Sequence, residues 1–348
     1  MNASSAQISA RRRKFENEVV VITGASAGVG RATALAFARA GARVVLIARG
    51  AEGLESARRE IELAGGAVLT ISVDVSDAGA LDAAAGRVES ELGPIDIWVN
   101  NAMVTVFGAV SELSPDEFKR VTEVTYLGGV YGTMAALKRM RPRDRGVIVQ
   151  VSSALAYRSI PLQSAYCGAK HALAGFIDSL RCELIHERSR IHLTAVQMPA
   201  LNTPQFAWAR NKLPHRPQPV PPIFQPEVAA EAILYAAGHR RRDIPVGAPT
   251  WKAEWGQRLL PGLLDRYLGR TAYDGQQTSQ PDNHDRADNL FQPVSADART
   301  HGDFDSRALA SSRALWVEKH RAVIGTGVLA ACVLALGCAI AGRRHAER

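Results

Sequence analysis

A tyrosine and a lysine four residues apart, Tyr166 and Lys170, form the pair in this sequence best suited to transferring a proton. At this spacing two side chains lie on one face of a helix, about 6 Å apart. A free tyrosine has a pKa near 10, which is high for proton transfer at neutral pH. Because a nearby ammonium favours the phenolate, we expect Lys170 to lower the pKa of Tyr166. Ser153 directly follows an apolar run, where its hydroxyl could bind a substrate carbonyl. A chance pairing on a helix surface is the alternative.

A glycine-rich turn separates the first apolar run from a helix-length stretch. The turn reads Thr23-Gly24-Ala25-Ser26-Ala27-Gly28-Val29-Gly30. Glycines let the backbone approach a pyrophosphate, whose charge the helix N-terminus stabilises. A tight strand-to-helix loop is the alternative, but a second strand follows at the spacing of a dinucleotide-binding unit. We therefore predict a dinucleotide site formed by Gly24, Ser26, Ala27, Gly28, Val29 and Gly30.

The end of the second apolar run indicates which dinucleotide is bound. Folds that prefer NAD place an acidic residue there, which accepts hydrogen bonds from the ribose 2′-hydroxyl. This chain has Ala48 followed by Arg49. An arginine can pair with a phosphate through both arms of its guanidinium, so Arg49 predicts NADP as the cofactor. An exposed cation at a strand end is the alternative.

Taken together, these motifs resemble the short-chain dehydrogenase/reductase family over about residues 19–247. The resemblance rests on T-G-x-x-x-G-x-G, Asn100-Asn101-Ala102, Ser153 and Tyr166-x-x-x-Lys170, in that order along the chain. It implies that Tyr166 is the general acid/base, that Lys170 lowers its pKa and holds the nicotinamide ribose, and that Ser153 orients the substrate oxygen. The implied reaction interconverts a carbonyl and an alcohol by hydride transfer.

The resemblance also implies further cofactor contacts. It places Asp74 and Val75 beside the adenine, and Asn101 and Ala102 beside the adenosine ribose. It assigns cofactor contacts to the segment Pro199-Ala200-Leu201-Asn202-Thr203 through Pro199, Leu201 and Thr203, with Thr203 on the carboxamide.

Three positions depart from the family pattern, and one of them is Ala200, where the family usually has glycine. Thr125 stands where the family has a catalytic asparagine, which helps to hold a water for proton relay to the lysine. A threonine hydroxyl could hold the same water, so we count Thr125 among the candidate catalytic residues. Met103 replaces the glycine that commonly follows Asn-Asn-Ala.

Short apolar runs alternate with longer helical stretches through most of the chain. Unbroken apolar runs are typical of strands buried on both faces of a parallel sheet, joined by right-handed crossovers. We predict an α/β fold, a Rossmann-type doubly wound parallel sheet, as a single domain over residues 18–270. The predicted strands cover residues 19–23, 43–48, 68–73, 95–100, 147–151 and 192–197. The predicted helices cover residues 30–40, 53–64, 80–92, 115–140 and 163–187.

The segments on either side of this domain differ from it in composition. Residues 1–17 form a basic extension, and residues 271–315 are polar enough to predict a disordered tether. Residues 322–342 carry no charge, are flanked by basic residues, and would span roughly 31 Å as a helix, close to the bilayer core. We predict a transmembrane helix there, with a buried core helix as the alternative. The protein would then be single-pass, with its catalytic domain in the cytoplasm, where NADPH is available. Trp251, Trp255 and residues 259–268 could form core, a pocket wall or an interfacial helix, and we favour packing against the catalytic domain.

Composition excludes several other classes of protein. With 47% hydrophobic and 22% charged residues, the 348-residue chain is neither disordered throughout nor collagen-like. Its four cysteines make no disulfide framework and no metal-type pair. The net charge of +8 comes partly from basic clusters without interleaved aromatic residues, so we predict no nucleic-acid partner.

Two functions remain open at this point. The first is an NADP-dependent oxidoreductase acting on a lipophilic carbonyl or alcohol, with Leu155, Tyr157, Ile160, Leu162, Phe206 and Trp208 as candidate pocket residues. The second is a non-catalytic NADP-binding membrane scaffold or redox sensor, which the threonine at position 125 motivates. The family resemblance also implies a homodimer or homotetramer.

Overall fold

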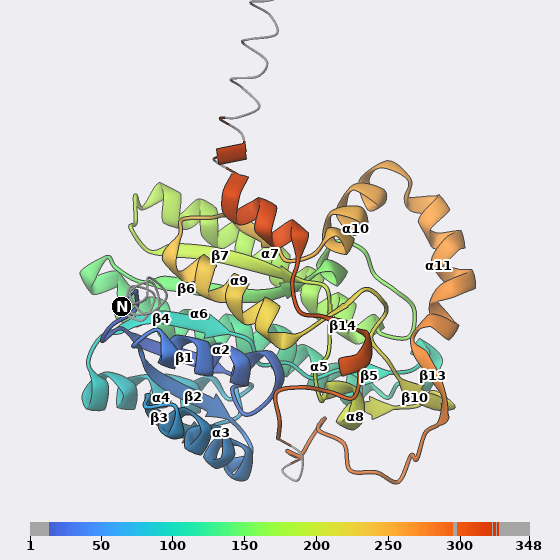
Figure 1. The fold of residues 1–348 in the computed structure, drawn as a ribbon, viewed down its shortest axis with the longest axis horizontal. Helices are drawn as coiled ribbons and strands as arrows, with labels where there is room; N and C mark the ends of the chain where they lie inside the picture. The colour runs from blue at the N-terminus through green and yellow to red at the C-terminus, as the bar shows by residue number, and fades with distance from the viewer. Residues whose placement is uncertain (1–13, 295–297, 322, 325, 327–348) are drawn as a thin grey trace, which may run out of the picture.

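The computed structural model describes residues 14–294, 298–321, 323, 324 and 326, and its centre is a parallel sheet of seven strands (Figure 1). Their order is β12-β7-β6-β4-β1-β2-β3. This confirms the predicted doubly wound α/β fold. The strands are β1 (Val19–Thr23), β2 (Arg43–Ala48), β3 (Ala67–Ser72), β4 (Ile95–Asn100), β6 (Val147–Ser153), β7 (His192–Met198) and β12 (Asp243–Pro245). The sequence did not predict β12, because three residues are too few to stand out as an apolar run.

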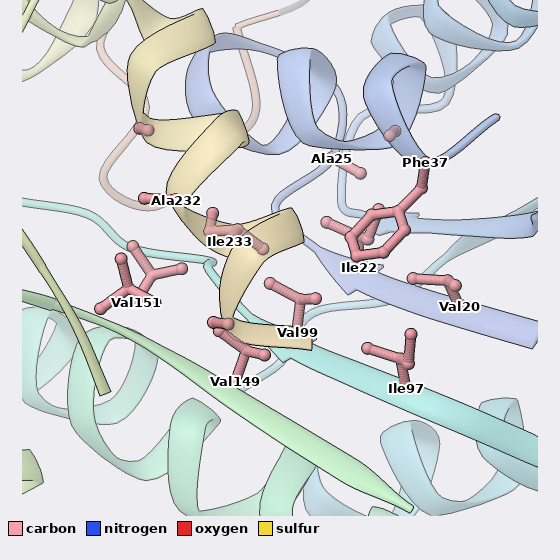
Figure 2. Packing of buried hydrophobic residues seen from close by; sticks show 14 of the residues in the cluster. Val20, Ile22, Ala25, Phe37, Ile97, Val99, Val149, Val151, Ala232 and Ile233 are labelled. Atoms are coloured by element: carbon pink, nitrogen blue, oxygen red, sulfur yellow. The ribbon is translucent and has the colours of Figure 1, made fainter. Parts of the chain in front are cut away.

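Helices cover both faces of the sheet. Successive strand residues point to opposite faces, so Val20 and Ile22 join one apolar cluster and Val19 and Val21 join the other. Figure 2 shows Val20, Ile22 and Phe37 meeting on the first face. The helices there are α2 (Gly28–Arg39), α3 (Ala51–Leu63) and α9 (Pro226–Gly238), and those on the second face are α4 (Ala78–Leu92), α5 (Pro115–Thr122), α6 (Gly128–Met140) and α7 (Ser164–His186).

The long helix predicted over residues 115–140 is not uniform. Ser114 caps α5, since its hydroxyl accepts a hydrogen bond from the Glu117 backbone N–H at 3.2 Å. A five-residue π-helical turn, η2 (Glu123–Leu127), then joins α5 to α6. Such turns frequently lie at functional sites, and this one carries Thr125.

Short elements complete the described chain around this core. The helical ones are η1 (Val110–Glu112), η3 (Arg141–Arg143), η4 (Ala154–Ala156), α8 (Gln205–Trp208), α10 (Ala248–Leu259), α11 (Pro261–Gly275) and η5 (Asp305–Arg307). The extended ones are β5 (Val106–Phe107), β8 (Ala200–Leu201), β9 (Arg210–Asn211), β10 (His215–Pro217), β11 (Ile223–Phe224), β13 (Gln277–Pro281) and β14 (Ala308–Leu309).

The prediction of a disordered tether over residues 271–315 is wrong for the residues that the structure describes. Strand β13 pairs with β10, and β14 pairs with β11, so the segment folds back onto the catalytic domain. Leu290 is fully buried and Leu315 is 2% exposed. A polar composition prevents this segment from folding alone, but it does not prevent docking when the domain supplies polar partners. Two examples are the Asp288–Arg210 ion pair at 2.8 Å and the Asn211 Nδ2 to Asp282 Oδ2 hydrogen bond at 2.8 Å.

The prediction that Trp251, Trp255 and residues 259–268 pack against the domain holds for the contact of α10 with η4, but most of their apolar side chains are exposed. Helices α10 and α11 form an arch at one side of the molecule (Figure 1). Trp255 is 55% exposed, and Leu263 and Tyr267 are each 60% exposed. Between residues 14 and 326, within the ranges described, no helix is both long and apolar enough to cross a bilayer. The predicted transmembrane helix at 322–342 lies almost entirely outside the described residues.

Candidate active site

The glycine-rich turn joins β1 to α2 at the carboxyl edge of the sheet, where the strands of open α/β sheets meet their ligands. Gly24 has a φ of 67°, which favours glycine. The Asn101 side-chain amide donates to the carbonyls of Thr23 and Gly24 at 3.0 and 3.2 Å, and so joins the turn to the end of β4. A Cβ atom on Gly30 would lie 2.2 Å from the Gly24 carbonyl oxygen. Gly30 therefore allows the helix to approach the turn.

A cleft beside this turn brings together most of the predicted cofactor residues. Those that line it are Gly24, Ser26, Ala27, Gly28, Val29, Arg49, Asp74, Val75, Asn101, Ala102 and Thr203. Of the residues predicted to contact the cofactor, Gly30, Tyr166, Lys170, Pro199 and Leu201 do not line it. Leu201 is instead buried in the core, where β8 pairs with β11.

One end of the cleft holds two cations and a carboxylate. Arg120 forms an ion pair with Asp74 and donates to the Ser76 hydroxyl at 2.8 Å. Burial acts to raise the pKa of Asp74, but hydrogen bonds from Ser76 and Arg120 hold it below its ordinary value. Arg49 lies beside this group, and burial together with the charge of Arg120 lowers its pKa.

The proposed catalytic side chains lie together at the ends of β6 and α7. Ser153 is the last residue of β6, and its hydroxyl accepts a hydrogen bond from the Leu155 backbone N–H at 3.1 Å. Tyr166 and Lys170 lie one turn apart on α7. The Lys170 ammonium is 5.6 Å from the centre of the Tyr166 ring and donates to the Val151 carbonyl at 2.8 Å. The fold therefore brings together all three predicted residues, Ser153 from β6 and the Tyr166 and Lys170 pair from α7.

The expected lowering of the Tyr166 pKa is wrong for this structure. Burial raises the pKa of Tyr166, and the neighbouring Ser153 side chain offsets only part of the shift. Burial also lowers the pKa of Lys170 to about 8, because the ammonium is removed from water without a carboxylate partner. Tyr166 therefore keeps its proton at neutral pH, which is the form required to donate one.

Thr125 has a structural contact that its sequence position did not predict. Its hydroxyl donates to the Val104 carbonyl at 2.8 Å and accepts from the Val104 backbone N–H at 3.1 Å. Thr125 thereby holds the chain that follows Asn101 and Ala102 against η2. Val104 and Val124 both line the cleft, so this contact fixes part of the cleft wall.

Replacing Thr125 with valine should test this contact. The change keeps the shape of the side chain but leaves the buried N–H and C=O of Val104 without partners, at a cost of about 1–3 kcal/mol. We expect the melting temperature to fall by several degrees, measured by circular dichroism. Thr125→Ser, which keeps the hydroxyl, should recover most of the loss. An unchanged melting temperature in the valine variant would contradict this role.

Several residues of the cleft had no signal in the sequence. Asn289, Pro293, Val294 and Ala298 line it from the segment that was predicted to be a tether. Arg120 was also missed, because an arginine in the middle of a helix resembles any solvated cation. Its spatial partner Asp74 could have identified it only after the fold was known.

The site and the fold define a class of protein. The family model for short chain dehydrogenases matches residues 18–213, and the chain belongs to that family. It is 34% identical to the uncharacterised oxidoreductase YxnA of Bacillus subtilis over 273 residues, which are 78% of this chain and 77% of that protein. It is also 34% identical to dehydrogenase/reductase SDR family member 7B of Bos taurus over 272 residues, 75% of this chain and 83% of that protein. Among solved structures, an actinorhodin polyketide ketoreductase variant with NADPH superposes with a TM-score of 0.59 at 28% identity, covering 66% of this chain and 95% of that one.

Proposed function

We propose that this protein is an NADP-dependent oxidoreductase that interconverts a carbonyl and an alcohol. The observation that carries the proposal is that Ser153, Tyr166 and Lys170 lie together at the ends of β6 and α7, with the Lys170 ammonium 5.6 Å from the centre of the Tyr166 ring. The cleft residues fit a dinucleotide, since glycines allow close backbone approach at one point and Arg49 supplies a cation for a 2′-phosphate. The similar ketoreductase was solved with NADPH, which supports the same cofactor here.

The side chains divide the chemistry in a simple way. NADPH, when bound, supplies a hydride to the carbonyl carbon. Ser153 and Tyr166 hold the carbonyl oxygen, and Tyr166 donates its proton to that oxygen as negative charge develops there. Lys170 holds the nicotinamide ribose and keeps a positive charge beside the phenol. Asn101 and Thr203 both line the cleft and would contact the cofactor there.

A lipophilic substrate is supported by what surrounds the catalytic serine. Helix α10 packs on η4, which starts immediately after Ser153. Arg158 donates to the Gln257 side chain at 2.6 Å and pairs with Asp265 at 2.7 Å, so both arch helices are joined to the loop after β6. The exposed apolar side chains of the arch therefore lie on an element attached next to the catalytic serine.

A panel of ketones and aldehydes of increasing chain length, assayed with NADPH, tests this proposal. We expect kcat/KM to rise with the apolar length of the substrate. Absence of turnover over the whole panel, with NADPH binding intact, would favour the non-catalytic scaffold or redox sensor. Turnover only of short polar carbonyls would contradict the lipophilic substrate but not the reaction type.

The pH dependence of carbonyl reduction should report the Lys170 ammonium. Below its pKa of about 8 the lysine is charged, and it loses this charge as the pH rises. Tyr166 keeps its proton over the same range, because its pKa is raised. We expect kcat/KM for reduction to be level from pH 6 to 7 and to fall above about pH 8. Lys170→Arg keeps its positive charge at high pH, so the kcat/KM of that variant should not decrease above pH 8. A wild-type kcat/KM that stays level up to pH 10 would contradict the assignment.

Membrane anchoring, a cytoplasmic catalytic domain and a homodimer or homotetramer belong to the same proposal. Anchoring rests on the uncharged stretch 322–342 and its basic flanks. Deleting residues 322–348 leaves the buried Leu315 and its contacts in place. The shortened protein should move from the membrane pellet to the supernatant on sedimentation. If it stays in the pellet, the anchor lies elsewhere or the association has another cause.

A further inference from the structure

Three successive backbone carbonyls from a distant segment bind the guanidinium of Arg49. Its Nη2 donates to the Asn289 carbonyl, and its Nη1 donates to those of Leu290 and Phe291 at 3.2 and 3.1 Å. A guanidinium has five N–H donors, so two remain after these three bonds. The remaining donors belong to Nε and Nη2, neighbouring nitrogens that form one edge of the planar group. Among the residues that the structure describes, no partner takes the Nε and Nη2 edge of the Arg49 guanidinium, so this edge is available to a ligand.

The segment that supplies these carbonyls is firmly attached. The Leu290 side chain is fully buried and belongs to the apolar cluster that includes Val75 and Val124. Its carbonyl also accepts from Arg120 Nε at 3.1 Å, so it contacts both cations at this end of the cleft. The Leu290 N–H in turn donates to Asp288 Oδ1 at 2.9 Å. Removing the segment would expose an apolar side chain and break charge-assisted hydrogen bonds.

Attachment of this kind would orient a flexible side chain before the ligand arrives. A free arginine loses rotamer freedom when it binds a phosphate, which weakens binding, whereas an arginine already held in place loses little. A carbonyl is neutral and cannot satisfy the full charge of the guanidinium, so the open edge still favours an anion. The 2′-phosphate is the group that distinguishes NADP from NAD at this end of the cleft.

We propose that residues 289–291 determine the preference for NADP over NAD by holding Arg49 with its Nε and Nη2 edge toward the 2′-phosphate. Leu290 is the positioning residue, because its buried side chain fixes the three carbonyls. The inference rests on the proposed function, which assigns Arg49 to the 2′-phosphate.

The same contacts would also suit a segment that obstructs the cofactor. The free volume of the cleft is about 190 Å³, which is below the roughly 300–1,000 Å³ of typical ligand pockets. Some adjustment of the cleft walls is therefore needed on binding. An orienting segment and an obstructing one predict opposite changes in NADPH affinity when the segment is loosened.

Leu290→Ala, Arg49→Ala and the double variant separate these cases. The measurements are NADPH and NADH dissociation constants from nucleotide fluorescence without substrate, together with the ratio of kcat/KM for the two nucleotides. We expect Leu290→Ala to weaken NADPH binding about tenfold and to leave NADH nearly unchanged, an effect the size of one lost charge-assisted hydrogen bond. In the Arg49→Ala background, Leu290→Ala should cause no further loss of preference.

Two more variants serve as controls. One tests the role of the segment without opening a cavity, and the other makes the same truncation at a position that should not affect nucleotide binding. Asp288→Asn weakens the acceptor of the Leu290 N–H without opening a cavity, and it should shift the preference in the same direction by a smaller factor. Leu309→Ala makes the matched truncation at a 49% exposed position of the same C-terminal region and should change neither nucleotide. Melting temperatures of all variants show which of them are folded.

The outcomes distinguish the two levels of the proposal. If Arg49→Ala keeps the wild-type preference, the assignment of Arg49 in the proposed function fails, and this inference fails with it. If Arg49→Ala removes the preference but Leu290→Ala and Asp288→Asn keep it, only the positioning role is overturned. If Leu290→Ala weakens NADPH and NADH binding equally, the positioning role is overturned as well, because the segment then lines the cleft without distinguishing the two nucleotides. Tighter NADPH binding in Leu290→Ala overturns it in favour of obstruction.

Discussion

Tyr166→Phe should lower kcat/KM for carbonyl reduction by about 10²–10⁴, the usual contribution of a positioned general acid. The change removes one hydroxyl and leaves the ring beside Lys170. NADPH binding should change by less than about threefold, because the phenol holds the substrate oxygen more than the cofactor. Steady-state kinetics and nucleotide fluorescence provide the two measurements.

Tyr235→Phe is the matched control for this variant. Tyr235 lies in α9, on the opposite face of the sheet from α7, and its hydroxyl accepts a hydrogen bond from Arg241 at 3.1 Å. Its loss should affect stability slightly and catalysis hardly at all. If Tyr166→Phe retains more than a tenth of the wild-type kcat/KM, another group supplies the proton and the assignment of Tyr166 is wrong.

Gly30→Ala should abolish useful dinucleotide binding, with affinity for NADPH reduced by about a hundredfold or more. The added Cβ would lie 2.2 Å from the Gly24 carbonyl oxygen and 2.6 Å from the Asn101 side-chain amide. Neither contact is possible, so α2 must move away from the turn that it follows. Such overpacking costs about 1–3 kcal/mol and occasionally more. Nucleotide titration and thermal melting should both show the effect.

Gly175→Ala makes the same substitution where there is room for it. Gly175 lies within α7, and a Cβ there meets no atom within 4 Å. Alanine should stabilise that helix by roughly 0.5–1 kcal/mol. Normal NADPH binding by Gly30→Ala would show that the helix can shift without cost to the site.

The parts of the fold that local patterns encode were predicted well. Unbroken apolar runs such as Val19–Thr23 identified six of the seven strands of the sheet, because a strand buried on both faces leaves a continuous signal. The glycine-rich turn and the Tyr166 to Lys170 spacing were equally local. Each therefore placed its residues in the site without any knowledge of tertiary contacts.

The remaining features depend on contacts between distant parts of the chain. The upward pKa shift of Tyr166 results from burial, which the four-residue spacing to Lys170 does not reveal. The carbonyls that bind Arg49 come from residues about 240 positions later, in a segment whose polarity indicated no structure at all. Composition indicates whether a segment can fold alone. It does not indicate whether the segment becomes ordered by packing against another part of the protein.

The return of the C-terminal segment to Arg49 has a consequence for synthesis. A ribosome makes roughly 5–20 residues each second, and domains generally fold as their residues emerge. Here the sheet strands up to β7 emerge well before Leu290, which lies 241 positions after the arginine that it contacts. During that interval the growing chain presents a nearly complete sheet whose nucleotide cleft lacks one wall. Arg49 then lacks the carbonyls of residues 289–291, so on the proposal above its full selectivity for the cofactor would be acquired only after these residues have emerged.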